Sequence, residues 1–314
     1  MKVYKNLRII TLLLLLLCTI NALAQDVNED EDNLPENFRR QKGFHIGAFL
    51  GGYVPNKYTA YNYDGYGFDL DGNKNNFDNS WIRQKIEIQY GGRDGTNQPD
   101  QIAIALGVDP GANPKEWAFE ETDMPSNMKY QFGFLLGVNT QYLINAKNGI
   151  VLNANFAKLI VTGNFTMYAK PPSNSSQINK AIKTFGIVGG EQRLLLQLGY
   201  QRILGNNQKN NFFIEGGVNV TSSKFDKNEI QINNLTIDLA SNYNQIQYPS
   251  TTYYIRKPSK TGIGVFAGFG LDLVIGKKVI GQIVYQPSYE KINIGINPKL
   301  KLQHSAGLRV YYRL

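Results

Sequence analysis

The sequence predicts an all-β fold, an antiparallel up-and-down transmembrane β-barrel of eight strands with long extracellular loops. Three observations lead to this prediction. The chain opens with a secretion signal, it contains long segments of alternating apolar and polar residues, and its connections alternate between short and long. The 314 residues also include 19 Tyr, 16 Phe and 31 Gly, an enrichment that fits β-structure at a membrane.

The N-terminus has the order of a signal peptide. Three basic residues precede the apolar run 9–20, and the tripeptide 22–24 (Ala-Leu-Ala) fits a cleavage site. The run is shorter than the roughly 20 residues of a membrane-spanning helix, so we expect residues 1–24 to be removed. Cys18 leaves a lipoprotein alternative, although Leu17 stands where a lipobox has a small residue. The mature chain then has no cysteine, which excludes disulfides and thiolate chemistry.

Residues 25–42 are acidic and lack apolar periodicity, so we expect a flexible periplasmic segment there. Residues 43–314 form the predicted barrel. Its eight alternating segments are longer than the strands of about 5–6 residues in soluble proteins and reach the 9–11 that a membrane strand needs. They cover about 43–55, 127–143, 150–169, 182–204, 211–225, 261–276, 278–292 and 301–314.

Two segments show the alternation most clearly. In the second, one predicted face is apolar and consists of Met128, Tyr130, Phe132, Phe134, Leu136 and Val138. In the sixth, the apolar face consists of Ile263, Val265, Ala267, Phe269, Leu271, Leu273 and Ile275. The opposite face of the sixth segment is rich in glycine, which suits a narrow barrel. An apolar face toward lipid and a polar face toward the interior explain both segments.

The connections indicate how the barrel is oriented. Short turns rich in Asn, Gly and Lys occur at 145–149, 205–210 and 276–278, as tight turn geometry requires. Long loops cover about 56–126, 170–181, 226–260 and 293–300. Bacterial barrels have short periplasmic turns and long outer loops, and an even strand number places both termini in the periplasm.

The predicted inner face carries charges of both signs. We interpret them as a structural network of paired groups, because buried charges must be paired. A barrel of eight strands has an interior about filled by side chains, so an open diffusion pore is not expected. The residues of this predicted network are Glu191, Arg193, Glu215, Asp272 and Arg309.

The loop 56–126 is far longer than a connection needs, which indicates structure or function of its own. Within it, 80–90 and 101–106 read as strands extending above the membrane, or alternatively as a further membrane hairpin that would make ten strands. Aromatic residues in long loops are suited to binding. The candidate residues for recognition are Trp81, Trp117, Tyr243, Tyr248 and Tyr253.

Metal and catalytic motifs are weak in this chain. The stretch 69–75 resembles a calcium loop, but its Gly is misplaced and the bidentate Glu is missing. A barrel enzyme acting on lipids would use His with Ser, whereas His304 and Ser305 are adjacent in a strand and therefore point to opposite faces. We expect His45 near the periplasmic end of the first strand. We therefore expect no catalytic residue, no cofactor and no metal.

The last ten residues carry a resemblance to known proteins. A polar residue, Gly307, and then Val310, Tyr312 and Leu314 resemble the terminal assembly signal of outer-membrane proteins, with Leu in place of the usual Phe. Together with the signal peptide and the eight segments, the chain resembles outer-membrane β-barrel (porin-family) proteins of the Bacteroidetes type. The resemblance implies the cell outer membrane as location. It also implies lipid, lipopolysaccharide and the barrel-assembly machinery as partners, with another outer-membrane protein as a further candidate.

The expected function is non-enzymatic: structure, recognition or service as an accessory subunit of an outer-membrane complex. A long loop on a filled barrel has to serve recognition or assembly rather than transport. Two alternatives remain at this stage, a narrow-pore transport protein and a lipid-modifying barrel enzyme. Nucleic acid is not an expected partner, because the basic residues are scattered rather than clustered despite a net charge of +8.

Overall fold

The computed structural model describes residues 42–68, 73–92, 99–170, 181–205, 210–239, 259–276, 278–294 and 299–314. The predicted signal peptide and nearly all of the acidic segment lie outside these residues. So do most of the calcium-like stretch and the candidate tyrosines Tyr243, Tyr248 and Tyr253.

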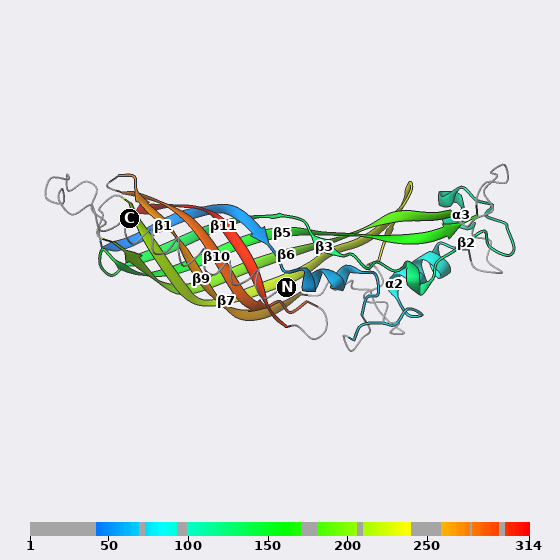
Figure 1. The fold of residues 1–314 in the computed structure, drawn as a ribbon, viewed down its shortest axis with the longest axis horizontal. Helices are drawn as coiled ribbons and strands as arrows, with labels where there is room; N and C mark the ends of the chain where they lie inside the picture. The colour runs from blue at the N-terminus through cyan, green and yellow to red at the C-terminus, as the bar shows by residue number, and fades with distance from the viewer. Residues whose placement is uncertain are drawn as a thin grey trace, which may run out of the picture.

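Eight antiparallel strands close into a ring (Figure 1). Each strand pairs with two neighbours in the order β5-β4-β1-β11-β10-β9-β7-β6, and pairing of β6 with β5 closes the circle. The predicted eight-strand barrel is therefore confirmed. Its strands are β1 (Gly43–Val54), β4 (Gly133–Leu143), β5 (Asn148–Ala169), β6 (Ala181–Leu204), β7 (Asn210–Ile232), β9 (Ser259–Val274), β10 (Val279–Lys291) and β11 (Leu300–Arg313).

The wall of the ring separates apolar from polar side chains. Alternate residues point outward along every strand, and the large apolar residues at these outward positions are exposed. Examples from four strands are Leu136, Leu196, Val265 and Val310. The inward positions between them are buried and often polar. The barrel thus has an apolar belt outside and an interior in which buried polar groups lie beside a cluster of apolar side chains.

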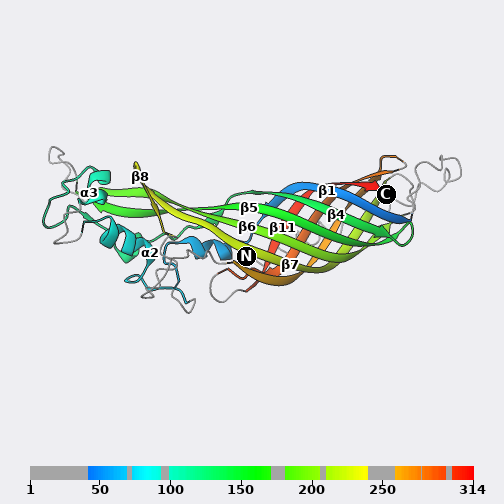
Figure 2. The same cartoon turned by 180° about the vertical axis from the view of Figure 1, so that it is seen from behind.

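Three strands run well past the ring. β5, β6 and β7 have 22, 24 and 23 residues, about twice what a membrane strand needs. They continue beyond the ring as a sheet of their own, which lies to the right in Figure 1 and to the left in Figure 2. β8 (Leu235–Asp238) extends this sheet by folding back on β7, and β2 (Trp117–Ala118) and β3 (Lys129–Tyr130) pair with β5.

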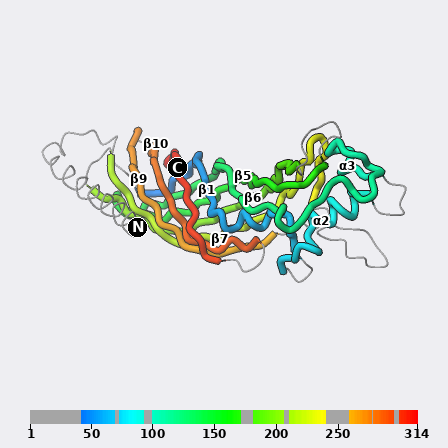
Figure 3. Tube along the Cα trace, turned by 45° about the vertical axis from the view of Figure 1, so that its right-hand side comes forward, coloured from blue at the N-terminus to red at the C-terminus, as the bar shows by residue number. Residues whose placement is uncertain are grey.

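The first loop folds against that sheet as a set of short helices (Figure 3). These are η2 (Lys57–Tyr63), α2 (Trp81–Arg83), η3 (Gln84–Gln89), α3 (Gln101–Leu106) and η4 (Glu121–Asp123). We call the helices together with the extended sheet the cap. Among the described residues, no helix has both the length and the apolar character to cross a membrane.

The prediction of strands at 80–90 and 101–106 was wrong, and so was the ten-strand alternative. Ser80 and Asp100 act as helix caps, accepting hydrogen bonds from the backbone N–H groups of Arg83 and Ala103. Gly107, with a left-handed φ of 74°, ends α3. Ile82 and Ile86 are both buried, and their spacing of four residues is that of one face of a helix. In the sequence, the apolar residues at every second position of this stretch had indicated a strand instead.

The predicted apolar face of the second segment was also partly wrong. Phe134, Leu136 and Val138 do point outward, but Met128 is buried and Tyr130 turns its hydroxyl into the barrel mouth. β3 and β4 are separate strands, and both residues between them, Gln131 and Phe132, are exposed. This interruption shifts the alternation by one residue and reverses the faces on its two sides.

The cap has an apolar core of its own. Side chains from the helices meet side chains from the extended strands, so that the helices and the sheet bury each other. From the helices and their connections come Ile82, Ile86, Ile102, Leu106, Trp117 and Phe119. From the sheet come Val161, Phe165, Met167, Phe185, Ile187, Phe225, Ile230, Ile232 and Ile237.

Candidate functional site

Two ion pairs occupy the barrel interior. In the first, Arg309 on β11 donates two hydrogen bonds of 2.8 Å each to the carboxylate of Glu215 on β7. Both side chains are fully buried. Gln201 and Gln286 donate further hydrogen bonds to the same carboxylate, at 3.2 and 3.3 Å. A bidentate guanidinium–carboxylate pair with added amide donors compensates the two charges where they are buried.

The second pair lies nearer the cap. Arg193 Nε donates to Glu191 Oε1 at 2.5 Å, and both residues stand on the inner face of β6. The Arg193 guanidinium also donates to the hydroxyls of Tyr53, Thr59 and Tyr130, at 3.0, 3.2 and 3.2 Å. A bulge between Gly190 and Glu191 interrupts the ladder to β7 at this point. The pair is therefore held by groups from β1, from η2 and from β3 together.

A third carboxylate, Glu290 on β10, is held by hydroxyl and amide groups. It accepts hydrogen bonds from Asn219 at 2.7 Å, from Ser288 at 3.0 Å and from Tyr53 at 3.3 Å, and Thr221 donates another. Tyr53 thus connects Glu290 with the Glu191–Arg193 pair. Farther from the cap, Gln282 donates to Asp272 at 2.7 Å.

Tyr63 also connects the cap with this interior, as Thr59 and Tyr130 do. Tyr63, at the end of η2, is fully buried and stacks on Phe225 with ring centroids 4.7 Å apart. Its hydroxyl donates to Glu191 Oε2 at 3.4 Å. Gly189 makes room for the ring, because a Cβ at that position would lie 2.4 Å from it. The first loop therefore reaches into the barrel mouth.

Polar groups also fix the helices of the cap. The Trp117 indole donates to Asp100 Oδ2 at 2.8 Å, which ties β2 to the start of α3. Asp64, which follows η2, forms an ion pair with Lys74. Burial raises the pKa of the Asp64 carboxyl above its usual range, while the ammonium of Lys74 opposes that shift.

All five residues of the predicted interior network point inward and are buried. The structure brings them together as two separate pairs, Glu191 with Arg193 and Glu215 with Arg309, and places Asp272 beside Gln282. The prediction omitted Tyr53, Tyr63, Thr59 and Glu290. The alternation in β1 and β10 could have placed Tyr53 and Glu290 inside, whereas no sequence pattern points to Tyr63 or Thr59.

The prediction that Trp81 and Trp117 are loop residues available for binding was wrong. Both indoles are buried in the core of the cap, with about 5% of the side chain exposed. A long loop that folds into a domain needs large apolar residues for its own core, and these two serve that purpose. The exposed large apolar residues of the helices are instead Tyr61, Ile88 and Ile104.

The residues of the terminal assembly signal lie at the seam between β11 and β1. Gly307 is opposite Gly51, and the strands approach so closely that a Cβ on Gly307 would lie 2.6 Å from the Gly51 Cα. Val310, Tyr312 and Leu314 are exposed on the outer wall.

His304 and Ser305 lie on opposite sides of the wall. The Ser305 hydroxyl is buried and donates to the Gln286 carbonyl at 3.0 Å, whereas His304 Nδ1 lies 2.6 Å from the Tyr285 hydroxyl. His45 pairs with Arg313 at the other end of the barrel. Among the described residues, no three side chains of His, Cys, Asp or Glu gather as metal ligands.

The chain matches no protein-family profile, and no curated protein matches its sequence. Several solved structures of bacterial barrels are similar to it. The outer membrane protein OprG from Pseudomonas aeruginosa shares 13% identity at a TM-score of 0.39, with 89% of this chain and all of OprG covered. Ail of Yersinia pestis, in complex with a heparin analogue, shares 12% at 0.31, with 87% and 97% covered. Neisserial surface protein A shares 11% at 0.33, with 60% and 91% covered.

The closed ring, the apolar belt and the buried polar groups of the interior together define a small β-barrel of the outer-membrane type. These structures share at most 13% identity with the chain, so no ligand or activity of theirs is assigned to it.

Proposed function

We propose that this chain is a non-enzymatic barrel of the bacterial outer membrane, of the porin-family type that its terminal segment suggests, and that its cap contacts a partner. The favoured role is recognition or service as an accessory subunit of an outer-membrane complex. The partner we favour is another outer-membrane protein. Insertion by the barrel-assembly machinery would use the terminal strand with Gly307, Val310, Tyr312 and Leu314.

One observation carries this proposal: the barrel interior is occupied by its own side chains while the cap is a folded domain. Arg193, Arg309 and Tyr53 are among the largest fully buried side chains of the described residues. Each is held by several hydrogen bonds across the interior. A filled barrel leaves the cap as the part of the molecule that can meet a partner, and loops placed on a rigid scaffold are where binding residues concentrate.

Gentle extraction of the tagged full-length chain from outer membranes, followed by native sizing and mass spectrometry, tests the proposal. We expect a stoichiometric protein partner to copurify. Ile88→Glu combined with Ile104→Glu should release it, because these exposed isoleucines offer apolar contacts on the helices of the cap.

The matched control is Gln89→Glu combined with Gln101→Glu. It adds the same two charges at exposed positions of the same helices but leaves both isoleucines in place, so it should retain the partner. A barrel that runs alone in its wild-type form would overturn the complex-subunit role. A partner that stays bound to the isoleucine variant would overturn the proposed contact surface.

Narrow-pore transport is the competing function, and conductance separates it from recognition. We expect the wild-type chain, reconstituted in a planar bilayer beside a porin as positive control, to give a flat current trace. The physical reason is the pair of buried arginines and their carboxylates across the interior. Reproducible single-channel steps from the purified chain would favour the transport role instead.

A further inference from the structure

The end of the barrel opposite the cap carries a set of cations. We call this end, where β1 begins and β11 ends, the far rim (Figure 1). Lys42 directly precedes β1, Lys278 precedes β10, and Arg202 and Arg313 lie near the ends of β6 and β11. Because β6 stands opposite β11 in the ring, these cations flank the opening from both sides.

The four cations have no carboxylate partner. Among the described residues, none of them takes part in an ion pair. The carboxylates of the barrel interior on this side, Glu215 and Asp272, are buried. They accept hydrogen bonds from Arg309 and Gln282 instead. The far rim is therefore a ring of positive charge without a compensating acidic side chain of the barrel.

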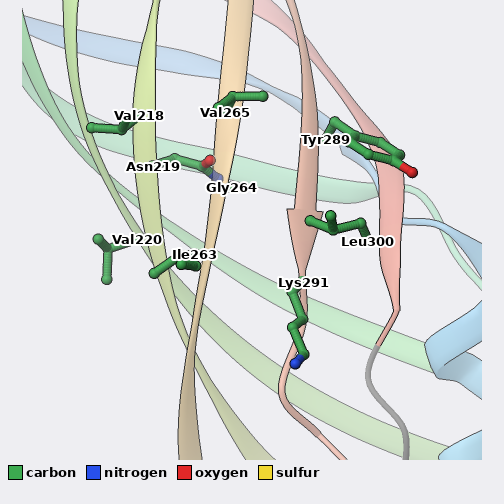
Figure 4. Close-up of a pocket in the computed structure, with 9 residues that line it drawn as sticks. All are labelled: Val218, Asn219, Val220, Ile263, Gly264, Val265, Tyr289, Lys291 and Leu300. Atoms are coloured by element: carbon green, nitrogen blue, oxygen red, sulfur yellow. The ribbon is translucent and has the colours of Figure 1, made fainter.

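The cap end has cations too, but it also has acidic side chains. Lys291 lies there, beside an apolar hollow in the outer wall (Figure 4). In the extended strands, Asp226 forms an ion pair with Lys158 at 3.9 Å, and Glu229 forms one with Lys227 at 2.9 Å. The lack of acidic side chains is thus particular to the far rim.

The sequence supplies acidic residues to the far rim in one place only, the segment directly before β1. Of the 25 Asp and Glu residues of the chain, all but six belong to the cap, to the barrel mouth beneath it or to the buried interior. The segment lies outside the described residues, but the chain leads from it straight into Lys42 and β1. Its six acidic residues are Asp26, Glu29, Asp30, Glu31, Asp32 and Glu36.

We propose that the acidic segment 26–36 docks on the far rim of its own barrel and covers the opening there. The length of the chain permits this contact. Eight tilted strands about 4.8 Å apart enclose an opening roughly 16 Å across. The seven residues from Glu36 to Gly43 span up to about 23 Å when extended, so the segment reaches every cation of the rim.

Attachment to β1 favours this occupant over a free acidic partner. A short tether gives the segment an effective concentration in the millimolar range. Several charges facing several charges also form a network, which contributes more than an isolated exposed pair. Arg39 and Arg40 lie between the segment and Lys42 and are the competing partners for its carboxylates. The docking goes beyond the proposed function and does not depend on it.

Zero-length carbodiimide crosslinking of the purified chain in detergent, followed by tryptic digestion and mass spectrometry, tests the docking. The reagent joins a carboxylate to an ammonium group only where the two are in contact. We expect the peptide that contains 26–36 to be linked to Lys278, but not to Lys57 or Lys299, which are exposed at the cap end. Raising NaCl from 0.1 to 1 M shortens the Debye length from about 10 to about 3 Å, so the yield should fall severalfold.

The reactivity of Lys278 toward an acylating reagent gives a second readout. Replacing the six acidic residues by their amides should raise it about fivefold, because a segment held at millimolar effective concentration shields the amine. The matched control, Arg39→Gln combined with Arg40→Gln, changes charges of the same stretch but keeps all six carboxylates, so Lys278 should stay protected. Heat-modifiable gel migration reports that the barrel is folded in each variant.

Three results would overturn the docking. The first is crosslinks from the segment to Lys42 alone, together with equal reactivity of Lys278 in the wild type and the amide variant. The second is crosslinks that join labelled to unlabelled chains in a mixture with ¹⁵N-labelled protein, which would make a second copy the donor of the segment. The third is protection of Lys278 only after phosphatidylglycerol is added, which would assign the rim to lipid head groups.

Discussion

Replacing Glu215 by Ala should lower the free energy of unfolding of the barrel by about 3–5 kcal/mol. The change leaves the Arg309 guanidinium fully buried without the carboxylate that accepts two of its hydrogen bonds. Breaking a buried ion pair from one side is costly because the remaining charge cannot be solvated. Urea unfolding in detergent, followed by heat-modifiable migration of the barrel, measures the loss.

Two controls make this result specific to the buried pair. The double variant Glu215→Gln with Arg309→Met removes both charges at similar volume and should be more stable than Glu215→Ala alone. Glu116→Ala removes one partner of the exposed Lys170–Glu116 pair and should leave the unfolding curve unchanged. A double variant less stable than the single one would show that the pair is not the source of the effect.

Replacing Trp117 by Ala should open the cap while the barrel stays folded. The indole is buried in the cap core and donates a hydrogen bond to Asp100, the residue that caps α3. Removal of a large buried aromatic side chain costs about 3–5 kcal/mol, and the lost hydrogen bond adds to it. Trp117 pairs with Ala169 at the end of β5 that lies beyond the ring, and it belongs to the apolar core of the cap and not to that of the ring, so the effect should be local.

Hydrogen exchange resolves the two parts of the molecule. Amides of α3 and of the β5 residues that pair with β2 should exchange faster in Trp117→Ala, while amides of β10 and β11 should not change. Ile104→Ala is the control, because Ile104 lies on α3, whose amides are followed, but its side chain is 56% exposed. Faster exchange across β10 and β11 would mean that cap and barrel unfold as one unit.

The ring could be predicted from the sequence because a membrane strand leaves a two-residue period along its whole length. The alternation of β9 from Ile263 to Leu273 identifies both the strand and its outer face. The same period places Glu215 and Arg309 inside. It does not show which charges meet, because that depends on the register between strands far apart in sequence.

The cap could not be predicted in the same way. Its helices are short, so Ile82 and Ile86 show hardly more than one helical turn, and the run from Trp81 to Tyr90 reads equally as a strand. The helix N-cap residues Ser80 and Asp100 were the sequence signal from which α2 and α3 could have been predicted. Tyr63 could not be found at all, because its place against Phe225 and Glu191 is created by tertiary packing alone.

The extended strands also determine how far α3, whose Leu106 carbonyl accepts a hydrogen bond from Lys183, stands from the ring. β6 continues for 11 residues, Ala181 to Glu191, beyond the level where Gln192 and Lys224 pair. At about 3.3 Å per residue this is a stalk of roughly 35 Å. In the proposed outer-membrane placement, a surface at that distance stands clear of the lipid head groups. In that placement α3 is open to contact by whole macromolecules such as proteases.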